Sequence, residues 1–410
     1  MNERHSFACS IPIGPVHPAL KEPIRVVIDV EGERVVNVDI KRGFAHRGIE
    51  FMGMKRNAIQ VIPLAERICG ICSISHPYAF VKAVENAADI YPAERGQYIR
   101  TIIAELERIH SHILWLGVAA HEMGFDSLLY LTWKGREKVL DILEYLTGNR
   151  INYSMQMFGG ARRDLDEKKI RALRDMISYY RIFNAKQKEI FLKDPTYRLR
   201  TRGVGILTKE IALQRCAVGP TARAAGIRLD VRQDQPFDAY ADFGVKAIVP
   251  EDYEDEYYGD VYDVTLVRLY EIDQSLDIIE FCIDNLPNGP ILSIPKMIQI
   301  LMHIKKNGKE AVGRYEAPRG EVFHYVKFEN SDVPKVWKVR APSYSNINVW
   351  EDILLGAEIA DVPVAIAYID PCLCCNDRIA VVRKEGKVLP WEKIVEECVR
   401  KTNRIRREIG

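Results

Sequence analysis

Two Cys-x-x-Cys pairs near opposite ends of the chain constrain its fold most. The first, in RICGICSISH, contains Cys69 and Cys72, and the second, in DPCLCCNDR, contains Cys372 and Cys375. Two such pairs supply four thiolates, enough to enclose one metal centre. Structural zinc and surface disulfides are simpler interpretations, but zinc sites usually close over roughly 15–20 residues. Here 300 residues separate the pairs, and the isoleucines and valines beside both predict a buried site where the two ends of the fold meet.

Polar residues flank both pairs. Arg67 and His76 lie beside the first pair, and Arg378 follows the second. A cation or an imidazole beside thiolates lowers the thiol pKa and can handle protons, although salt bridges and a hydrogen-bonded core histidine are plainer interpretations. Cys374 is expected to point away from a shared metal, and four more cysteines read as small core or surface side chains: Cys9, Cys216, Cys282 and Cys398.

Composition narrows the function classes. A formal net charge of +1, from 58 basic and 57 acidic residues, gives no reason to expect nucleic acid as a partner. No apolar run approaches the roughly 18–20 residues that span a bilayer, and the N-terminus lacks the apolar core of a signal peptide. Nine cysteines without a disulfide-rich pattern favour a reducing cytoplasm. Charged residues at 28% hint at a thermophile.

The hydrophobic patterns predict an α+β chain that is mainly α-helical. Residues 24–30 and 34–40 read as one β-hairpin, and 320–329 with 335–342 as another. The pattern in 98–117 predicts a helix that Gly117 ends. Further helical patterns cover 134–146, 166–192, 208–216, 261–286, 294–305 and the charged C-terminal segment.

Four segments follow from these patterns. Residues 1–50 are expected to form an N-terminal β element and the loop that contains His17 and Pro18 (the HP loop). Residues 51–318 are expected to form a helical bundle that carries the first cysteine pair. Residues 319–378 contribute a β-hairpin and the second pair, which closes the site. Residues 379–410 form a C-terminal tail with helical character.

The two cysteine motifs carry a family resemblance. RxCGxCxxxH and DPCxxCxxR match the signatures of the large subunit of group 4 membrane-bound [NiFe]-hydrogenases. GPVHPAL, GFAHRGIE, ERIHSHILWLG, GGARRDL, YEAPRGE and RAPSYSNI also resemble the 49-kDa-type subunit of respiratory complex I, so the resemblance covers nearly the whole chain. It implies the [NiFe]-hydrogenase large-subunit fold, a central helix bundle with small N-terminal and C-terminal β elements.

This resemblance implies a nickel–iron centre. Cys69 and Cys372 would bind nickel terminally, while Cys72 and Cys375 would bridge to an iron that carries diatomic ligands. Arg319, in YEAPRGE, resembles the arginine over the open face of that centre. The implied partners are a small subunit with a [4Fe–4S] cluster, which receives electrons from ferredoxin, and a membrane arm of antiporter-like subunits.

Three departures change the expected chemistry. Lys21 stands where close hydrogenases have a proton-relaying glutamate, although Glu22 beside it could take over. Hydrogenase large subunits lose a C-terminal tail when nickel is inserted, yet 32 residues follow Arg378 here. His17 matches a quinone partner of complex I, but Phe80 stands where its tyrosine aligns, and Tyr78 is out of register. The nickel–iron centre is therefore in doubt, and quinone reduction is disfavoured.

With these departures the chain resembles the large subunit of the membrane-bound sulfane sulfur reductase of hyperthermophilic archaea. That resemblance implies a ferredoxin-dependent reduction of sulfane sulfur or polysulfide, coupled to Na⁺ pumping by partner subunits, at the cytoplasmic face of the membrane. The four thiols would then be metal-free, with Arg67, His76, Arg319 and Arg378 as anion contacts. A hydrogen-evolving [NiFe]-hydrogenase is the alternative, followed by a quinone-reductase-like or non-catalytic coupling subunit.

Overall fold

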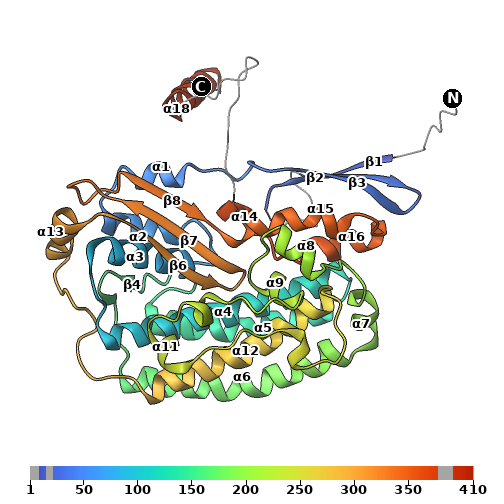
Figure 1. Ribbon diagram of the computed structural model, residues 1–410, viewed down its shortest axis with the longest axis horizontal. Coiled ribbons are helices and arrows are strands. Elements are labelled where there is room, and N and C mark those ends of the chain that lie inside the picture. The colour runs from blue at the N-terminus through green and yellow to red at the C-terminus, as the bar shows by residue number, and fades with distance from the viewer. Residues whose placement is uncertain (1–8, 15–21, 377–390, 410) are drawn as a thin grey trace.

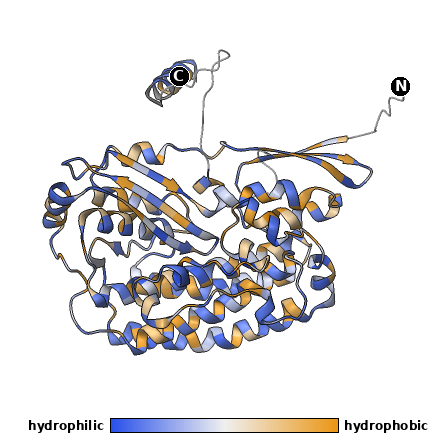
Figure 2. Ribbon diagram, in the orientation of Figure 1, coloured by the Kyte–Doolittle hydropathy of each residue, from blue (hydrophilic) through white to orange (hydrophobic). Residues whose placement is uncertain are grey.

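Four long helices form the centre of the molecule. The computed structural model describes residues 9–14, 22–376 and 391–409. In it α4 (Glu94–Glu122), α5 (Asp126–Thr147), α6 (Glu167–Lys193) and α12 (Val261–Asp284) pack side by side (Figure 1). Both hydrophobic and hydrophilic residues run along α6, as expected of a helix with one buried face (Figure 2). The predicted fold class, mainly helical with small sheets, is confirmed.

Helix α4 does not end at Gly117, as the sequence analysis predicted. It continues to Glu122, and Gly117 lies within it against α5. A Cβ atom at this position would lie 2.5 Å from Thr132 Oγ1 and 2.6 Å from Trp133 Nε1. The glycine therefore permits the close approach of two helices rather than ending one of them.

A three-stranded antiparallel sheet covers helix α3 (Ser75–Ala88). Its order is β6 (Glu310–Ala317), β7 (Gly320–Lys327) and β8 (Val336–Arg340), so the predicted second hairpin is present as β7 and β8. Strand β6 was missed and falls within the segment 51–318 that was expected to be helical. Because β6 and β7 are joined by a tight turn, the residues between them, Pro318 and Arg319, are held rigidly.

The contact between α3 and β6 depends on Gly313. A Cβ atom there would lie 2.0 Å from Ala79 O and 2.4 Å from Ala83 N. We expect Gly313→Val to force helix and sheet apart and to lower the free energy of unfolding by about 3 kcal/mol, the upper range of overpacking in a core. Chemical denaturation of the purified protein measures this, and a loss below about 0.5 kcal/mol would contradict the packing described.

The N-terminal sheet joins the two halves of the chain. Strands β2 (Arg25–Glu31) and β3 (Arg34–Lys41) form the predicted hairpin, and β1 (Cys9–Ile13) adds a third antiparallel strand. Val35 N donates to Ala357 O at 2.9 Å, and Gly356 N donates to Val35 O at 2.8 Å. The N-terminal sheet is thereby tied to the segment that leads into the second cysteine pair.

Shorter helices complete the fold, and the other predicted helical patterns are present as helices. Their bounds are α1 Ile49–Gly53, α2 Ala58–Glu66, α7 Pro195–Thr201, α8 Lys209–Gln214, α9 Pro220–Ala224, α10 Val231–Asp234, α11 Ala239–Phe243, α13 Met297–Asn307, α14 Pro342–Asn346, α15 Trp350–Leu354, α16 Val362–Ala367, α17 Leu373–Asn376 and α18 Trp391–Ile409; two short strands, β4 (Gln156–Met157) and β5 (Gly160–Ala161), pair with each other. Among the helices of the described residues, none has the length and apolar content to span a bilayer.

Candidate active site

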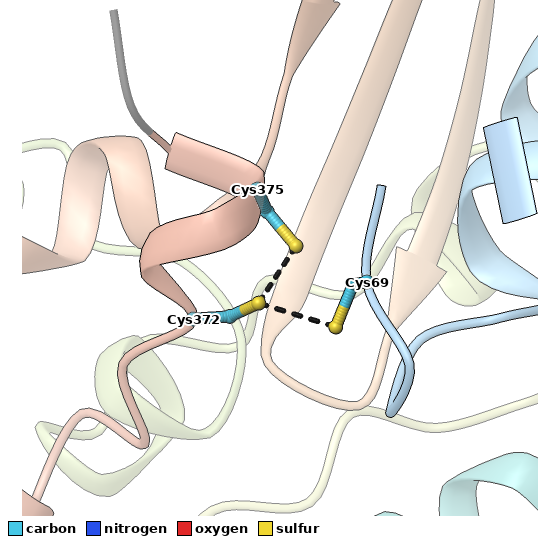
Figure 3. A group of neighbouring side chains, drawn as sticks. All are labelled: Cys69, Cys372 and Cys375. Carbon is cyan, nitrogen blue, oxygen red and sulfur yellow. Dashed lines mark hydrogen bonds between the residues drawn. The ribbon is translucent and has the colours of Figure 1, made fainter. Parts of the chain in front are cut away.

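The two cysteine pairs meet in the interior. The first pair lies in the loop between α2 and α3, and the second lies at α17. Cys372 Sγ is 3.1 Å from Cys69 Sγ and 2.8 Å from Cys375 Sγ, and the three sulfurs point toward one another (Figure 3). All four motif cysteines are buried, none more than 4% exposed. The structure thus brings together residues that are 300 positions apart in the chain.

Arg319 contacts Cys72, the fourth cysteine of the two motifs. Its Nη1 donates to Cys72 Sγ at 3.3 Å and to Ser111 Oγ at 3.1 Å, while its Nη2 pairs with Asp370 Oδ1 at 2.8 Å. Burial alone would lower the pKa of Arg319, but Asp370 and the cysteines raise it well above its ordinary value. The guanidinium therefore stays charged beside the sulfurs.

Backbone geometry places Arg319 there. It stands in the turn between β6 and β7, and this turn lies against Gly219. A Cβ atom at Gly219 would be 2.4 Å from both Arg319 O and the Cα of Gly320. Only a residue without a side chain fits there, which links the segment GPTARAAG (219–226) to the site.

The four thiols differ in acidity. Hydrogen bonds from the other three cysteines lower the pKa of Cys69 well below that of an ordinary thiol, although burial opposes this. Ile71 N and Cys72 N also donate to Cys69 Sγ, each at 3.3 Å. The hydrogen bond to Cys69, with burial, raises the pKa of Cys72, and burial raises that of Cys375. A metal that binds all four sulfurs would therefore release protons.

Glu107 of α4 anchors the first cysteine loop. Its carboxylate accepts hydrogen bonds from Ile74 N and from Ser75 N, the latter at 3.2 Å, at the start of α3. Burial raises the pKa of Glu107 to about 8. The sequence analysis quoted ERIHSHILWLG but gave Glu107 no role, because its link to the cysteine loop depends on tertiary contact.

Arg47 bridges the two cysteine segments and was also missed. Its guanidinium donates to the carbonyl oxygens of Arg67 at 2.8 Å, Ile68 at 2.5 Å and Cys374 at 3.2 Å. Three carbonyls from two distant segments meet at one planar cation, so Arg47 holds the segments together. Its place in GFAHRGIE was the only available signal.

Glu22 lies directly at the second pair. Its Oε2 accepts from Leu373 N and from Cys374 N, the latter at 2.9 Å, at the start of α17. Burial and this carboxylate raise the pKa of Cys374 to about 12. Lys21 and His17 lie outside the described residues.

Two predicted anion contacts lie elsewhere. The Arg67 side chain is 56% exposed and binds Pro63 O and Glu66, so it does not face the sulfurs. His76 is buried, and its Nδ1 lies 3.2 Å from His324 Nε2, as expected of a hydrogen-bonded core histidine. Arg378 lies outside the described residues.

Phe80 and Tyr78, the two aromatic residues compared with the quinone-binding tyrosine of complex I, both have packing or hydrogen-bond partners. Phe80 is buried, and its ring packs against those of Phe158 and Trp337. The hydroxyl of Tyr78 donates to Asp238 Oδ2 at 2.5 Å, and its ring stacks on Tyr315.

The donor set suits a soft transition metal. Among the described residues, Cys69, Cys372 and Cys375 form a group whose sulfurs all lie within 4.8 Å of one another, and Cys72 adjoins Cys69. Thiolates select nickel, zinc and iron over hard cations such as magnesium. Four buried sulfurs beside one fixed guanidinium fit the nickel–iron centre that the cysteine motifs imply.

Fold and site together define a hydrogenase-type large subunit, and comparison with known proteins agrees. The family model of the respiratory-chain NADH dehydrogenase 49 Kd subunit matches residues 122–378, and that of nickel-dependent hydrogenase matches residues 47–118. The chain belongs to this family of oxidoreductase subunits.

Several relatives are similar over most of the chain. It is 47% identical to the membrane-bound hydrogenase subunit alpha of Pyrococcus furiosus, over 96% of this chain and 93% of that protein. It is 36% identical to the carbon monoxide-induced hydrogenase of Rhodospirillum rubrum, over 90% and 99%. Among solved structures, a chain of the membrane-bound sulfane sulfur reductase, an archaeal respiratory membrane complex, superimposes with a TM-score of 0.83 at 29% identity, covering 90% of this chain and 98% of that one.

Proposed function

We propose that this chain is the catalytic large subunit of a membrane-associated, hydrogen-evolving [NiFe]-hydrogenase. The convergence of four buried cysteine sulfurs beside Arg319 carries the proposal. When bound, a nickel–iron centre supplies the redox chemistry that joins protons and electrons into hydrogen. Cys69, Cys72, Cys372 and Cys375 would hold it.

This proposal reverses the preference that the sequence alone supported. That preference for sulfur reduction rested on Lys21, which lies outside the described residues, and on the residues after Arg378, of which the structure describes 391–409. A tail encoded in a sequence does not show that the tail persists in the assembled protein. In addition, the identity to a named hydrogenase is 47%, against 29% for the sulfane sulfur reductase chain.

The side chains around the sulfurs would each have a different role. Arg319 fixes a positive charge at Cys72, where it would stabilise negative charge that develops at the site and keep the sulfur oriented. Arg47 and Glu107 hold the two cysteine loops in register. Glu22, bound to the backbone of α17, is the carboxylate placed to carry protons to and from the second pair.

The relatives support a proposal for the partners and the location. One relative is a subunit of a membrane-bound hydrogenase, and the similar solved structure is a chain of an archaeal respiratory membrane complex. We infer a peripheral place at the cytoplasmic face of the membrane, next to a small subunit whose [4Fe–4S] cluster passes on electrons from ferredoxin. Antiporter-like membrane subunits would couple this electron flow to ion pumping.

Sulfane sulfur reduction is the second candidate, because a chain of that reductase has the same fold along 98% of its length. In that case the thiols of Cys372 and Cys375 would exchange with polysulfide without a metal. The purified complex, supplied with reduced ferredoxin, distinguishes the two. We expect hydrogen without added sulfur compounds; sulfide from an organic trisulfide, with no hydrogen, would establish the second candidate instead.

Replacing Glu22 by glutamine tests the proton path. The amide keeps the size of the side chain but cannot carry a proton, so we expect hydrogen evolution to fall by about 10²-fold or more, the scale of general acid–base catalysis. Nickel content should stay unchanged, because Glu22 contacts the backbone amides of Leu373 and Cys374 and the Cys374 thiol, none of which is a proposed metal ligand. Glu50→Gln, which changes a carboxylate bound to Val339 N, is the matched control. Equal rates for both variants would exclude Glu22 as the relay.

A further inference from the structure

A chain of buried ionic side chains runs from Arg319 into the helix bundle. Asp370 pairs with Arg319 through Oδ1, and its Oδ2 lies 3.5 Å from Arg268 Nη1. The Arg268 guanidinium lies over the ring of Trp115, 4.6 Å from its centroid. All of these side chains are at most 2% exposed, so solvent does not screen the charges.

His112 is the next member, and its two nitrogens have different partners. Nδ1 lies 3.1 Å from Arg268 Nη1, and Nε2 lies 2.7 Å from Glu271 Oε2. A guanidinium only donates, so Nδ1 must accept and the ring hydrogen must sit on Nε2, where it is donated to Glu271. Burial lowers the pKa of His112 to about 4, in keeping with a neutral ring. Glu271 therefore fixes both the tautomer and the orientation of His112.

Glu271 itself is held in place. Its Oε1 accepts from Arg223 Nε at 2.7 Å, and Arg223 Nη1 donates to Glu316 Oε1 at 2.8 Å. Glu316 belongs to β6, the strand that leads into the turn carrying Arg319. The series therefore begins at Arg319 in the turn and ends in the strand that leads into that turn.

We propose that His112 and Glu271 are positioning residues of this site, which act through Arg268 and Asp370 to hold the Arg319 guanidinium at the sulfur of Cys72. Neither residue touches a sulfur. A glutamine at position 271 has a single acceptor oxygen, so it cannot accept from both His112 Nε2 and Arg223 Nε as the two carboxylate oxygens do. The ring of His112 then loses its fixed orientation, and Arg268 loses a fixed nitrogen acceptor. Asp370 is then drawn toward Arg268, and Arg319 shifts away from Cys72.

The kinetic part of this inference rests on the proposed hydrogenase activity, so two readouts are needed. We expect Glu271→Gln, in the purified complex, to lower kcat for hydrogen evolution by about ten-fold or more, the range for residues one layer removed from a metal site. KM for ferredoxin should not change. The cryo-EM structure of the variant should show the separation of Arg319 Nη1 and Cys72 Sγ lengthened from 3.3 Å.

Glu85→Gln is the control for a purely structural effect. Glu85 is also buried and pairs with Arg100 through both oxygens, but it is not part of the series. It should lower the melting temperature to a similar extent while leaving kcat and the Arg319 contact unchanged. A Glu271→Gln protein with the same kcat as Glu85→Gln and an unmoved Arg319 would overturn the proposal.

A second variant keeps the proposal testable if Glu271→Gln alone fails to fold. His112→Phe removes both ring nitrogens, and the double variant with Glu271→Gln should lose no more activity than His112→Phe alone, because both act through one path. Independent, multiplicative losses would contradict action in series. If the unaltered complex contains no nickel and makes no hydrogen, the proposed function fails, whereas the position of Arg319 in the variants still decides this inference.

Discussion

Changing Cys375 to serine is expected to remove nickel from the purified complex and to abolish hydrogen evolution. Cys375 Sγ lies 2.8 Å from Cys372 Sγ in the buried cluster, and a serine oxygen is a hard, weakly acidic ligand that does not replace a thiolate on nickel. Even residues behind the ligands typically change affinity or activity 10–100-fold, so we expect a loss of at least about 100-fold. Metal analysis and hydrogen evolution with reduced ferredoxin measure both effects.

Cys374→Ser is a matched control on the same helix. Cys374 is half-buried, and both its backbone amide and its thiol contact Glu22, so its sulfur lies outside the group formed by Cys69, Cys372 and Cys375. Its variant should keep nickel and most of the activity. If Cys374→Ser loses as much nickel as Cys375→Ser, the loss reflects disturbance of α17 and the assignment of Cys375 as a ligand would be wrong.

The Arg319→Lys variant should keep its nickel but evolve hydrogen much more slowly. The guanidinium bonds Cys72, Ser111, the Asp370 carboxylate and Asp370 O at once, from Nε and both Nη atoms. An ammonium group cannot reproduce this planar arrangement, so the lysine would pair with Asp370 and lose its contact with Cys72 Sγ. Removal of one such preorganised donor typically costs 10²–10³-fold in kcat, and we expect about 10²-fold.

Arg314→Lys, in the strand before the same turn, is the control for this variant. Arg314 pairs with Glu321 near the surface, away from the sulfurs, so its activity should be unchanged. Nickel content should be equal in both variants and the unaltered complex. An Arg319→Lys complex with a normal rate would show that the guanidinium is not needed at Cys72.

The parts of the fold that sequence predicted well are those that depend on local pattern. The period of apolar residues in α4 and the alternation in β2 and β3 are visible within a short window of sequence. Gly117 was misread because glycine commonly ends helices, whereas here it allows Trp133 of α5 to approach, a reason that lies in another helix. Strand β6 was missed because it is buried mainly against α3, and the sequence does not show that contact.

The residues of the site also differ in how far the sequence predicts them. The cysteine spacing identified four side chains that converge, because metal ligation demands sulfur pairs at short intervals. Arg67 and His76 were proposed from nearness in sequence, but a residue two positions from a ligand can point to solvent, as the half-exposed Arg67 does. Arg47 and Glu107 do their work through backbone contacts across long separations, which no spacing in the chain reveals.

Nickel content, measured together with the intact mass of this chain in the purified complex, tests the account most directly. The hydrogenase assignment predicts about one nickel per chain, held by Cys69, Cys72, Cys372 and Cys375, and its loss in Cys375→Ser but not in Cys374→Ser. The intact mass shows whether the residues after Arg378 are still present, so metal insertion and chain length are compared in one sample. A complex that lacks nickel, retains the full chain and still oxidises ferredoxin would contradict the account and favour thiol-based sulfur reduction.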